Sequence, residues 1–226
     1  MTRRTQSRGP CAFCGTMFAK GGLTRHLAAC PERQEAIRAA DQRAGKTQQL
    51  AHLQVRDAWG GDYWLHLEMN GTATLDALDN YLRAIWLECC GHLSQFSVGG
   101  WRGDEIPMST TIARVFAPGV ELTHIYDFGT SSETLVKVVG TREGRPLTGH
   151  PITLMARNEA PEADCMECGE RARWMCPECV NEFDQSGLLC ERHAEDHPHD
   201  EDLLMAVVNS PRMGMCGYSG PAEPPY

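Results

Sequence analysis

The chain has 226 residues, of which 42% are hydrophobic and 23% are charged, so it has enough apolar material to fold around a core. No apolar run approaches the roughly 20 residues of a membrane-spanning helix, and the basic N-terminus lacks the apolar stretch of a secretory signal. We therefore expect a cytoplasmic protein. Because the cytosol keeps thiols reduced, the eleven cysteines favour metal sites over disulfides.

The formal net charge of −9 is unevenly distributed along the chain. Residues 1–46 hold nine Lys/Arg and three Asp/Glu, whereas residues 159–204 hold three Lys/Arg and fourteen Asp/Glu. This asymmetry predicts modules with different partners. It also argues against binding of the whole chain along DNA, because the acidic half would be repelled by the phosphates.

The first chemical motif is a C-x2-C-x11-H-x3-C cluster of four residues: Cys11, Cys14, His26 and Cys30. Two cysteines two residues apart fit a tight turn, and two ligands four residues apart lie on one face of a helix, so the four complete a tetrahedral zinc shell. The segment resembles a C2HC-type zinc finger, in which Phe18 and Leu23 would form the small core. We expect no membrane partner.

The finger has two open interpretations. Side chains near the start of a finger helix read bases in the major groove, and here that stretch offers Lys20, Thr24 and Arg25. One finger covers about three base pairs, so binding to nucleic acid through residues 1–46 is expected to be weak and non-specific. The other interpretation is a small structural or protein-binding cap. Flanking arginines available for phosphate contacts are Arg3, Arg4, Arg8, Arg33, Arg38 and Arg43.

The middle of the chain has the patterning of an α+β domain. Residues 31–57 are rich in Ala, Gln, Glu and Arg and predict a polar helix or linker that breaks near Gly45. Short connections favour mostly antiparallel strands. Alternation and helical spacing predict strands at 63–69, 92–98, 121–128, 134–139 and 151–157, a helix at 74–88 and a short helix at 109–116.

The strand that ends in Tyr126-Asp127-Phe128-Gly129 carries a family resemblance. Residues 48–158 resemble the plasmid pRiA open-reading-frame-three-like family, whose members are also described as TnpR-like passenger proteins of insertion elements and whose strand reads YDFGDSWEH. The resemblance implies an α+β fold and association with mobile DNA, and it supplies no catalytic residues. The Asp, Trp and His of the family motif are replaced here by Thr130, Ser132 and Thr134.

An enzyme site in the middle domain is the weakest hypothesis. A histidine on an apolar strand is more often a satisfied core residue than a catalyst, and Asp127 is expected to order its own turn through its side chain. The adjacent Cys89 and Cys90 are interpreted as packing thiols at the end of a helix. A deep pocket with converging side chains of His124, Asp127 and Glu133 would favour catalysis, with His66 and His92 as further polar candidates.

The C-terminal region carries a second, denser cluster of eight ligands in four pairs: Cys165, Cys168, Cys176, Cys179, Cys190, His193, His197 and His199. If the pairs fill in sequence, one ion has four cysteines and the other has one cysteine and three histidines. If they alternate, the first and third pairs bind one ion and the second and fourth pairs bind the other. We favour alternation, because it ties together a segment that has almost no core. Cys216 either replaces His197 or His199 or is a thiol in the tail.

This cross-braced spacing resembles B-box and ZZ-type zinc modules, which implies a protein-interaction platform. We therefore expect an α+β protein with four segments: the finger and its basic tail at 1–33, a polar helical linker at 34–50, the α+β domain at 51–158, and the two-zinc module with its Gly/Pro-rich tail at 159–226. Its predicted function is that of a non-catalytic accessory protein with three zinc ions, associated with mobile elements, that binds nucleic acid through the finger and protein through the C-terminal module. The alternative is a pure protein-interaction adaptor.

Overall fold

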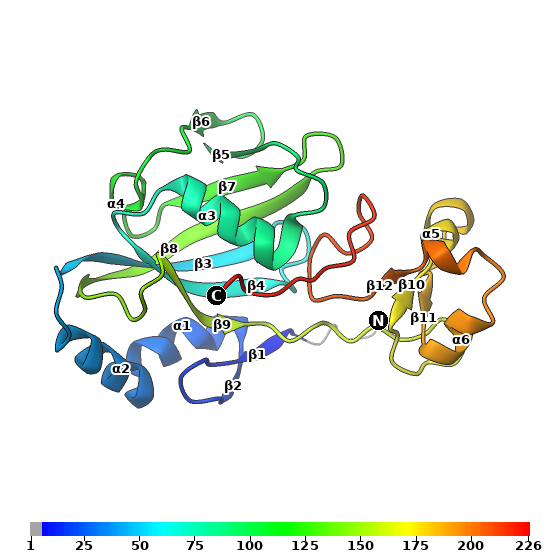
Figure 1. The fold of residues 1–226 in the computed structure, drawn as a ribbon, viewed down its shortest axis with the longest axis horizontal. Helices are drawn as coiled ribbons and strands as arrows, with labels where there is room; N and C mark the ends of the chain where they lie inside the picture. Colours follow the sequence, from blue (N-terminus) through cyan, green and yellow to red (C-terminus); the bar gives the residue numbers. More distant parts are fainter. Residues whose placement is uncertain (1–5) are drawn as a thin grey trace.

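A seven-stranded, wholly antiparallel sheet forms the centre of the molecule, which a computed structural model describes over residues 6–226 (Figure 1). Arg3 and Arg4 lie outside the described residues. Within 6–226 no helix has the length and apolar character needed to cross a membrane. The spatial order is β6 (Asp104–Ile106), β5 (Ser94–Val98), β7 (Glu121–Tyr126), β8 (Ser132–Gly144), β3 (Gln48–Asp57), β4 (Trp64–Asn70) and β9 (Ile152–Arg157).

The prediction of a polar helix or linker over residues 31–57 is wrong for residues 48–57. Residues 48–57 form β3, which lies between β8 and β4 and pairs with both. The signal was an alternation of period two, in which Ala51, Leu53, Val55 and Asp57 are buried and the residues between them are half-buried. The three-residue strand β6 was not predicted, and β8 extends well beyond the predicted 134–139.

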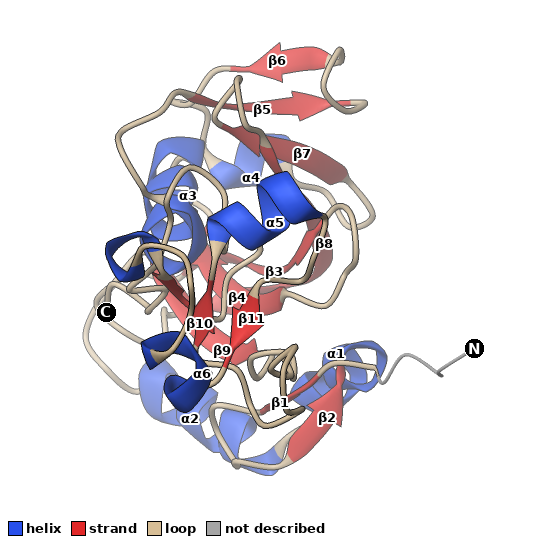
Figure 2. Cartoon of the chain, turned by 90° about the vertical axis from the view of Figure 1, so that its right-hand side faces the viewer, coloured by secondary structure: helices blue, strands red, loops and turns tan. Residues whose placement is uncertain are grey.

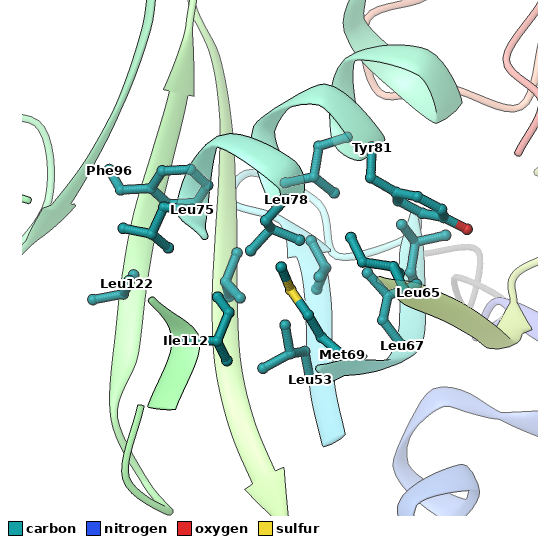
Figure 3. Close-up of a cluster of buried hydrophobic side chains, with 14 of the residues drawn as sticks. Leu53, Leu65, Leu67, Met69, Leu75, Leu78, Tyr81, Phe96, Ile112 and Leu122 are labelled. Atoms are coloured by element: carbon teal, nitrogen blue, oxygen red, sulfur yellow. The ribbon is translucent and has the colours of Figure 1, made fainter. Parts of the chain in front are cut away.

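One face of the sheet is covered by the helix predicted at 74–88. It consists of α3 (Leu75–Leu82), which Thr74 caps by accepting a hydrogen bond from the Ala77 N–H, and a π-helical turn η1 (Arg83–Leu87). The short helix α4 (Ile112–Val115) closes the same side. The main core therefore lies between this helical layer and the sheet, with Leu53, Leu67, Leu75, Leu78 and Ile112 among its fully buried members (Figure 3).

The N-terminal finger covers the opposite face. It contains the hairpin β1 (Arg8–Pro10) and β2 (Met17–Ala19) and the helices α1 (Lys20–Ala29) and α2 (Pro31–Asp41). Leu23 and Leu27 of α1 share a buried cluster with Trp64 of β4 and Met155 of β9. Because successive side chains of a strand point to opposite faces, β4 is buried on both sides. The finger is thus packed onto the sheet through its own small core (Figure 1).

The C-terminal module is a separate small body at one end of the molecule (Figure 1), and in Figure 2 this end faces the viewer. Its three-stranded sheet has the order β11 (Leu188–Leu189), β10 (Trp174–Met175) and β12 (Met205–Ala206), with the helices α5 (Pro177–Phe183), α6 (Glu191–Glu195) and η2 (Glu201–Leu203). After β12 the chain returns to the central domain, where the ring of Tyr226 stacks on His150.

Candidate metal centres and an acidic pocket

The structure brings together the four expected residues of the finger. Cys11 and Cys14 come from the turn after β1, His26 lies on α1 and Cys30 ends that helix. The Cys11 and Cys30 Sγ atoms are 4.0 Å apart, and Cys14 Sγ is 3.4 Å from His26 Nε2. Bonds of about 2.3 Å to sulfur place tetrahedral ligand atoms about 3.5–3.8 Å apart, so this set has the dimensions of a four-coordinate metal site. Phe18 stacks on the His26 ring at 4.0 Å and holds its orientation.

The eight C-terminal ligands are grouped in the alternating arrangement. Cys165, Cys168, Cys190 and His193 form one set, in which Cys168 Sγ and Cys190 Sγ are 3.8 Å apart and His193 Nδ1 is 3.4 Å from Cys165 Sγ.

The second set contains Cys176, Cys179, His197 and His199. His199 Nδ1 lies 3.2 Å from Cys176 Sγ, and His197 Nε2 lies 3.3 Å from Cys179 Sγ. Each set joins ligands from distant parts of the module, and the module's hydrophobic core contains little besides Leu189, Ala194 and ligand cysteines. Metal ions would therefore supply much of the stability of this segment.

The thiols of these sets differ in how readily they ionise. Burial raises the pKa of Cys30 and of Cys179 to about 11. Burial also opposes ionisation of Cys165, but backbone hydrogen bonds from Cys190, Glu167 and Cys168 outweigh it and lower that pKa to about 6. A metal ion binds the thiolate, so loading the sites that contain Cys30 and Cys179 must displace protons at neutral pH.

Each set offers four protein ligands. A closed shell of four side chains leaves no coordination position for a substrate or a reactive water, and it is the arrangement of structural metal sites. These clusters could therefore hold metal ions in a structural role. The choice between metal ions follows from ligand type, and cysteine with histidine is the set that Zn²⁺ prefers.

The expected nucleic-acid residues of the finger do not form a single basic face. Lys20 donates a hydrogen bond to the Gly61 carbonyl at 2.8 Å, Thr24 is half-buried beside a cavity, and Arg25 is exposed. The expectation that Arg33 contacts phosphate is wrong. Arg33 is buried and donates to the Glu68 carboxylate at 2.9 Å and to the Leu27 carbonyl at 3.1 Å.

Three other arginines of the expected phosphate-contacting set also have partners within the protein. Arg8 donates to the Met17 carbonyl, Arg43 donates to the Leu147 carbonyl, and Arg38 pairs with Glu35 on the exposed face of α2. Arg25 is thus left as a side chain of the finger helix that points to solvent, in a helix face otherwise made of Gly and Ala.

Of the five polar candidates of the middle domain, the structure brings two together: His92 Nε2 lies 3.5 Å from Asp127 Oδ2. His124 is fully buried and satisfied, with Nε2 2.7 Å from Asp79 Oδ1 and Nδ1 3.2 Å from Thr134 Oγ1. Asp127 orders its turn by accepting the Gly129 and Thr130 N–H groups. Its other oxygen accepts from Arg212 at 2.7 Å, and Glu133 lines a pocket of about 240 Å³ with Asp57 and Tyr63.

Two further features of the structure were not predicted from the sequence. Cys90 is exposed rather than packed, and it lies with Cys89, His92 and Cys216 in a fourth group of ligand atoms. Because Cys90 is exposed, the interpretation of Cys89 and Cys90 as packing thiols is wrong for Cys90. The pattern C-C-x-H was visible in the sequence, but the fourth member of the group, Cys216, is 126 residues away from Cys90. Cys216 replaces neither His197 nor His199.

The second feature is a pocket of about 280 Å³ on the C-terminal module. Its floor is apolar, with Trp174, Ala194 and Leu204, and its rim is acidic. The rim carboxylates belong to Glu191, Glu195, Glu201 and Asp202. Trp174 is fixed by a hydrogen bond from Nε1 to the Glu191 carboxylate at 3.1 Å, so the apolar wall is preformed.

No protein-family model and no curated protein matches the chain. Among solved structures, it is similar to a crystal structure of a protein of unknown function from Methanosarcina mazei Go1, with 16% identity and a TM-score of 0.40. That alignment covers 47% of this chain and 68% of the other. The resemblance of residues 48–158 to the pRiA open-reading-frame-three-like family stays a prediction.

Proposed function

We propose that this protein is a zinc-stabilised, non-catalytic interaction protein whose C-terminal module binds a basic segment of a partner protein. The observation that carries the proposal is the pocket on that module, where an apolar floor is surrounded by four carboxylates. The Cys/His sets are closed shells, and their role in this proposal is to hold the module in the shape that forms the pocket.

The pocket has the chemistry of a site for Lys or Arg. The aliphatic stem of either side chain can lie on Trp174 and Leu204, with the charged end among the rim carboxylates. An indole face adds a cation–π attraction of about 0.5–2 kcal/mol. The surrounding residues 159–204 carry a formal charge of −11, which attracts a basic segment over a longer range.

The geometry favours this adaptor function over nucleic-acid binding. Arg33, Arg38 and Arg43 are engaged within the protein, and Lys20 already donates to a backbone carbonyl. The apolar face of α1 is buried on the central sheet, so the helix is not free to rotate toward a groove. Association with mobile elements rests on the family resemblance alone.

The test measures binding of the full-length, zinc-loaded protein to an array of peptides in which the number of Lys and Arg residues varies. We expect retention to rise with Lys/Arg content and to fall as salt increases, because exposed ion pairs are screened. The double variant Glu195→Gln, Asp202→Asn should bind at least fivefold more weakly.

The matched control removes the same charge elsewhere in the module, through Glu162→Gln with Glu182→Gln, and should keep most of the binding. Equal losses in both double variants would show that net charge, rather than the pocket, attracts the peptide. A 20-base-pair DNA duplex in the same assay tests nucleic-acid binding. If the duplex binds more tightly than any basic peptide, the proposed function is wrong.

A further inference from the structure

Four side chains outside the expected sets converge at the edge of the central domain: Cys89, Cys90, His92 and Cys216. The first three lie between η1 and β5, on the loop that joins the helical layer to the sheet. Cys216 lies in the C-terminal tail, which follows the C-terminal module and returns to the central domain. The group thus joins two parts of the chain that are distant in sequence.

Three of the separations in this group are close to those of a tetrahedral shell, and a fourth is shorter. Cys89 Sγ and Cys90 Sγ are 3.6 Å apart, Cys90 Sγ and Cys216 Sγ are 3.7 Å apart, and His92 Nε2 is 3.4 Å from Cys216 Sγ. All four ligand atoms lie within 4.8 Å of one another, the same limit that the three expected sets satisfy. The shorter contact of 2.8 Å joins Cys90 Sγ and His92 Nε2.

Hydrogen bonds from Arg83 and Tyr126 hold the loop that carries three of the ligands. Arg83 donates to the His92 carbonyl at 2.6 Å and to Ser94 Oγ at 3.1 Å, and it also pairs with Glu88 at 2.7 Å. The Tyr126 hydroxyl donates to Glu88 at 3.1 Å. The ligands therefore approach one another on a supported backbone, which lowers the entropy lost when an ion binds.

The tail that carries Cys216 is fixed in the same way. Arg212 is fully buried and donates to the Thr130 carbonyl at 2.9 Å and to Asp127 at 2.7 Å. Cys216 follows four residues later with φ +51°, between Gly214 and Gly217, which also have positive φ. This tight turn places the Cys216 thiol against the loop of Cys89, Cys90 and His92.

Charged groups of both signs lie beside the four ligand atoms: Asp127 Oδ2 is 3.5 Å from His92 Nε2, and Arg212 pairs with that same carboxylate at 2.7 Å. Three thiolates and one neutral imidazole around a divalent cation leave a net charge of −1. Arg212 Nη2 lies 3.3 Å from Cys89 Sγ, and the Tyr126 hydroxyl is 3.7 Å from the same sulfur. Arg212 thus supplies a hydrogen-bond donor beside a ligating sulfur, as the outer shell of a metal–thiolate site does, whereas Tyr126 donates its only O–H to Glu88.

We propose that Cys89, Cys90, His92 and Cys216 bind a fourth zinc ion, which fastens the C-terminal tail to the central domain. The chain would then be attached to the central domain both before and after the C-terminal module along the sequence. Because Cys90 and Cys216 are exposed, this ion exchanges with solvent faster than ions in the three sets that contain buried cysteines.

The experiment compares zinc stoichiometry by native mass spectrometry in the reduced, full-length protein. The double variant Cys90→Ser, Cys216→Ser should bind one zinc ion fewer than the wild type, because two ligands do not retain the ion. A control variant in the same tail, Ser219→Ala, should keep the wild-type number. The difference of one is independent of how many of the other sets are filled.

A second measurement identifies the ligands. In protein loaded with ¹¹³Cd, the NMR shift depends on the number of sulfur ligands, and the double variant should lose one resonance of the three-sulfur type. Equal stoichiometry in wild type and double variant would overturn the proposal. So would a wild-type protein that, under reducing conditions, lacks this ion and holds a Cys90–Cys216 disulfide instead.

Discussion

Glu68 lies between two arginines that come from different elements. It accepts hydrogen bonds from Arg33 of α2 at 2.9 Å and from Arg142 of β8 at 2.6 and 2.9 Å, and its side chain is only 3% exposed. The carboxylate therefore joins the finger to the sheet. In a buried ion pair the loss of one partner is costly, because the remaining charge stays out of water.

We predict that Glu68→Gln lowers the free energy of unfolding by about 3–5 kcal/mol, since two guanidinium groups lose their counter-charge. Urea denaturation followed by circular dichroism measures the change. The matched control is Glu35→Gln, because the Arg38–Glu35 pair is exposed and should change stability by less than about 1 kcal/mol. Equal effects of the two substitutions would show that Glu68 is not an effective counter-charge.

At the scale of elements, β3 and β4 carry a pair of histidines, of which His66 is buried and His52 is half-buried. His52 Nε2 lies 2.8 Å from His66 Nδ1 across the two strands. Burial, together with the charge of His66, lowers the pKa of His52 to about 3, and burial lowers the pKa of His66 to about 4. Both imidazoles are therefore neutral in the folded protein at pH 7, and protonation favours the unfolded chain.

The folded pKa values lie below the unfolded value of about 6.5, so the unfolded state binds more protons between these limits. We predict that stability declines as the pH falls from about 6.5 to about 4, by of order 3 kcal/mol for His66 alone. Urea unfolding at several pH values should show a shallower decline in His66→Gln than in wild type. Metal release also occurs on acidification but is common to both proteins. Equal pH slopes would contradict the prediction.

At the scale of the whole molecule, the C-terminal module and the central sheet have separate cores. We predict that Cys176→Ser unfolds the module, because three remaining ligands bind the ion weakly and the module has little core of its own. Residues 48–158 should stay folded, since their apolar core contains no ligand of the three expected sets.

Hydrogen exchange followed by mass spectrometry distinguishes the two regions. Amides of residues 165–206 should lose their protection in Cys176→Ser, whereas those of β3, β4 and β8 should keep it. Val180→Ala is a control, because Val180 lies on the same helix α5 and is partly exposed. Loss of protection in the central strands would show that the two regions fold as one unit.

The sequence alone predicts features whose residues lie close together along the chain. The spacing of cysteine and histidine predicts the three metal-binding sets, because a turn or one helical turn brings nearby ligands together whatever the rest of the chain does. The α+β class and most of the strands and helices follow from local periodicity for the same reason. Strand β3 was missed because the Ala, Gln, Glu and Arg content of residues 31–57 favours a helix, and this composition outweighed the period-two alternation of residues 48–57.

Features that depend on distant residues were decided only by the tertiary structure. Sequence composition assigns Arg33 to a basic surface, but packing of α2 on the sheet buries it beside Glu68. The acidic pocket forms from β10, α6 and η2, and the fourth cysteine group needs the return of the tail to the sheet. Local spacing carries no information about which surfaces meet, because that is set by the burial of apolar area over the whole chain.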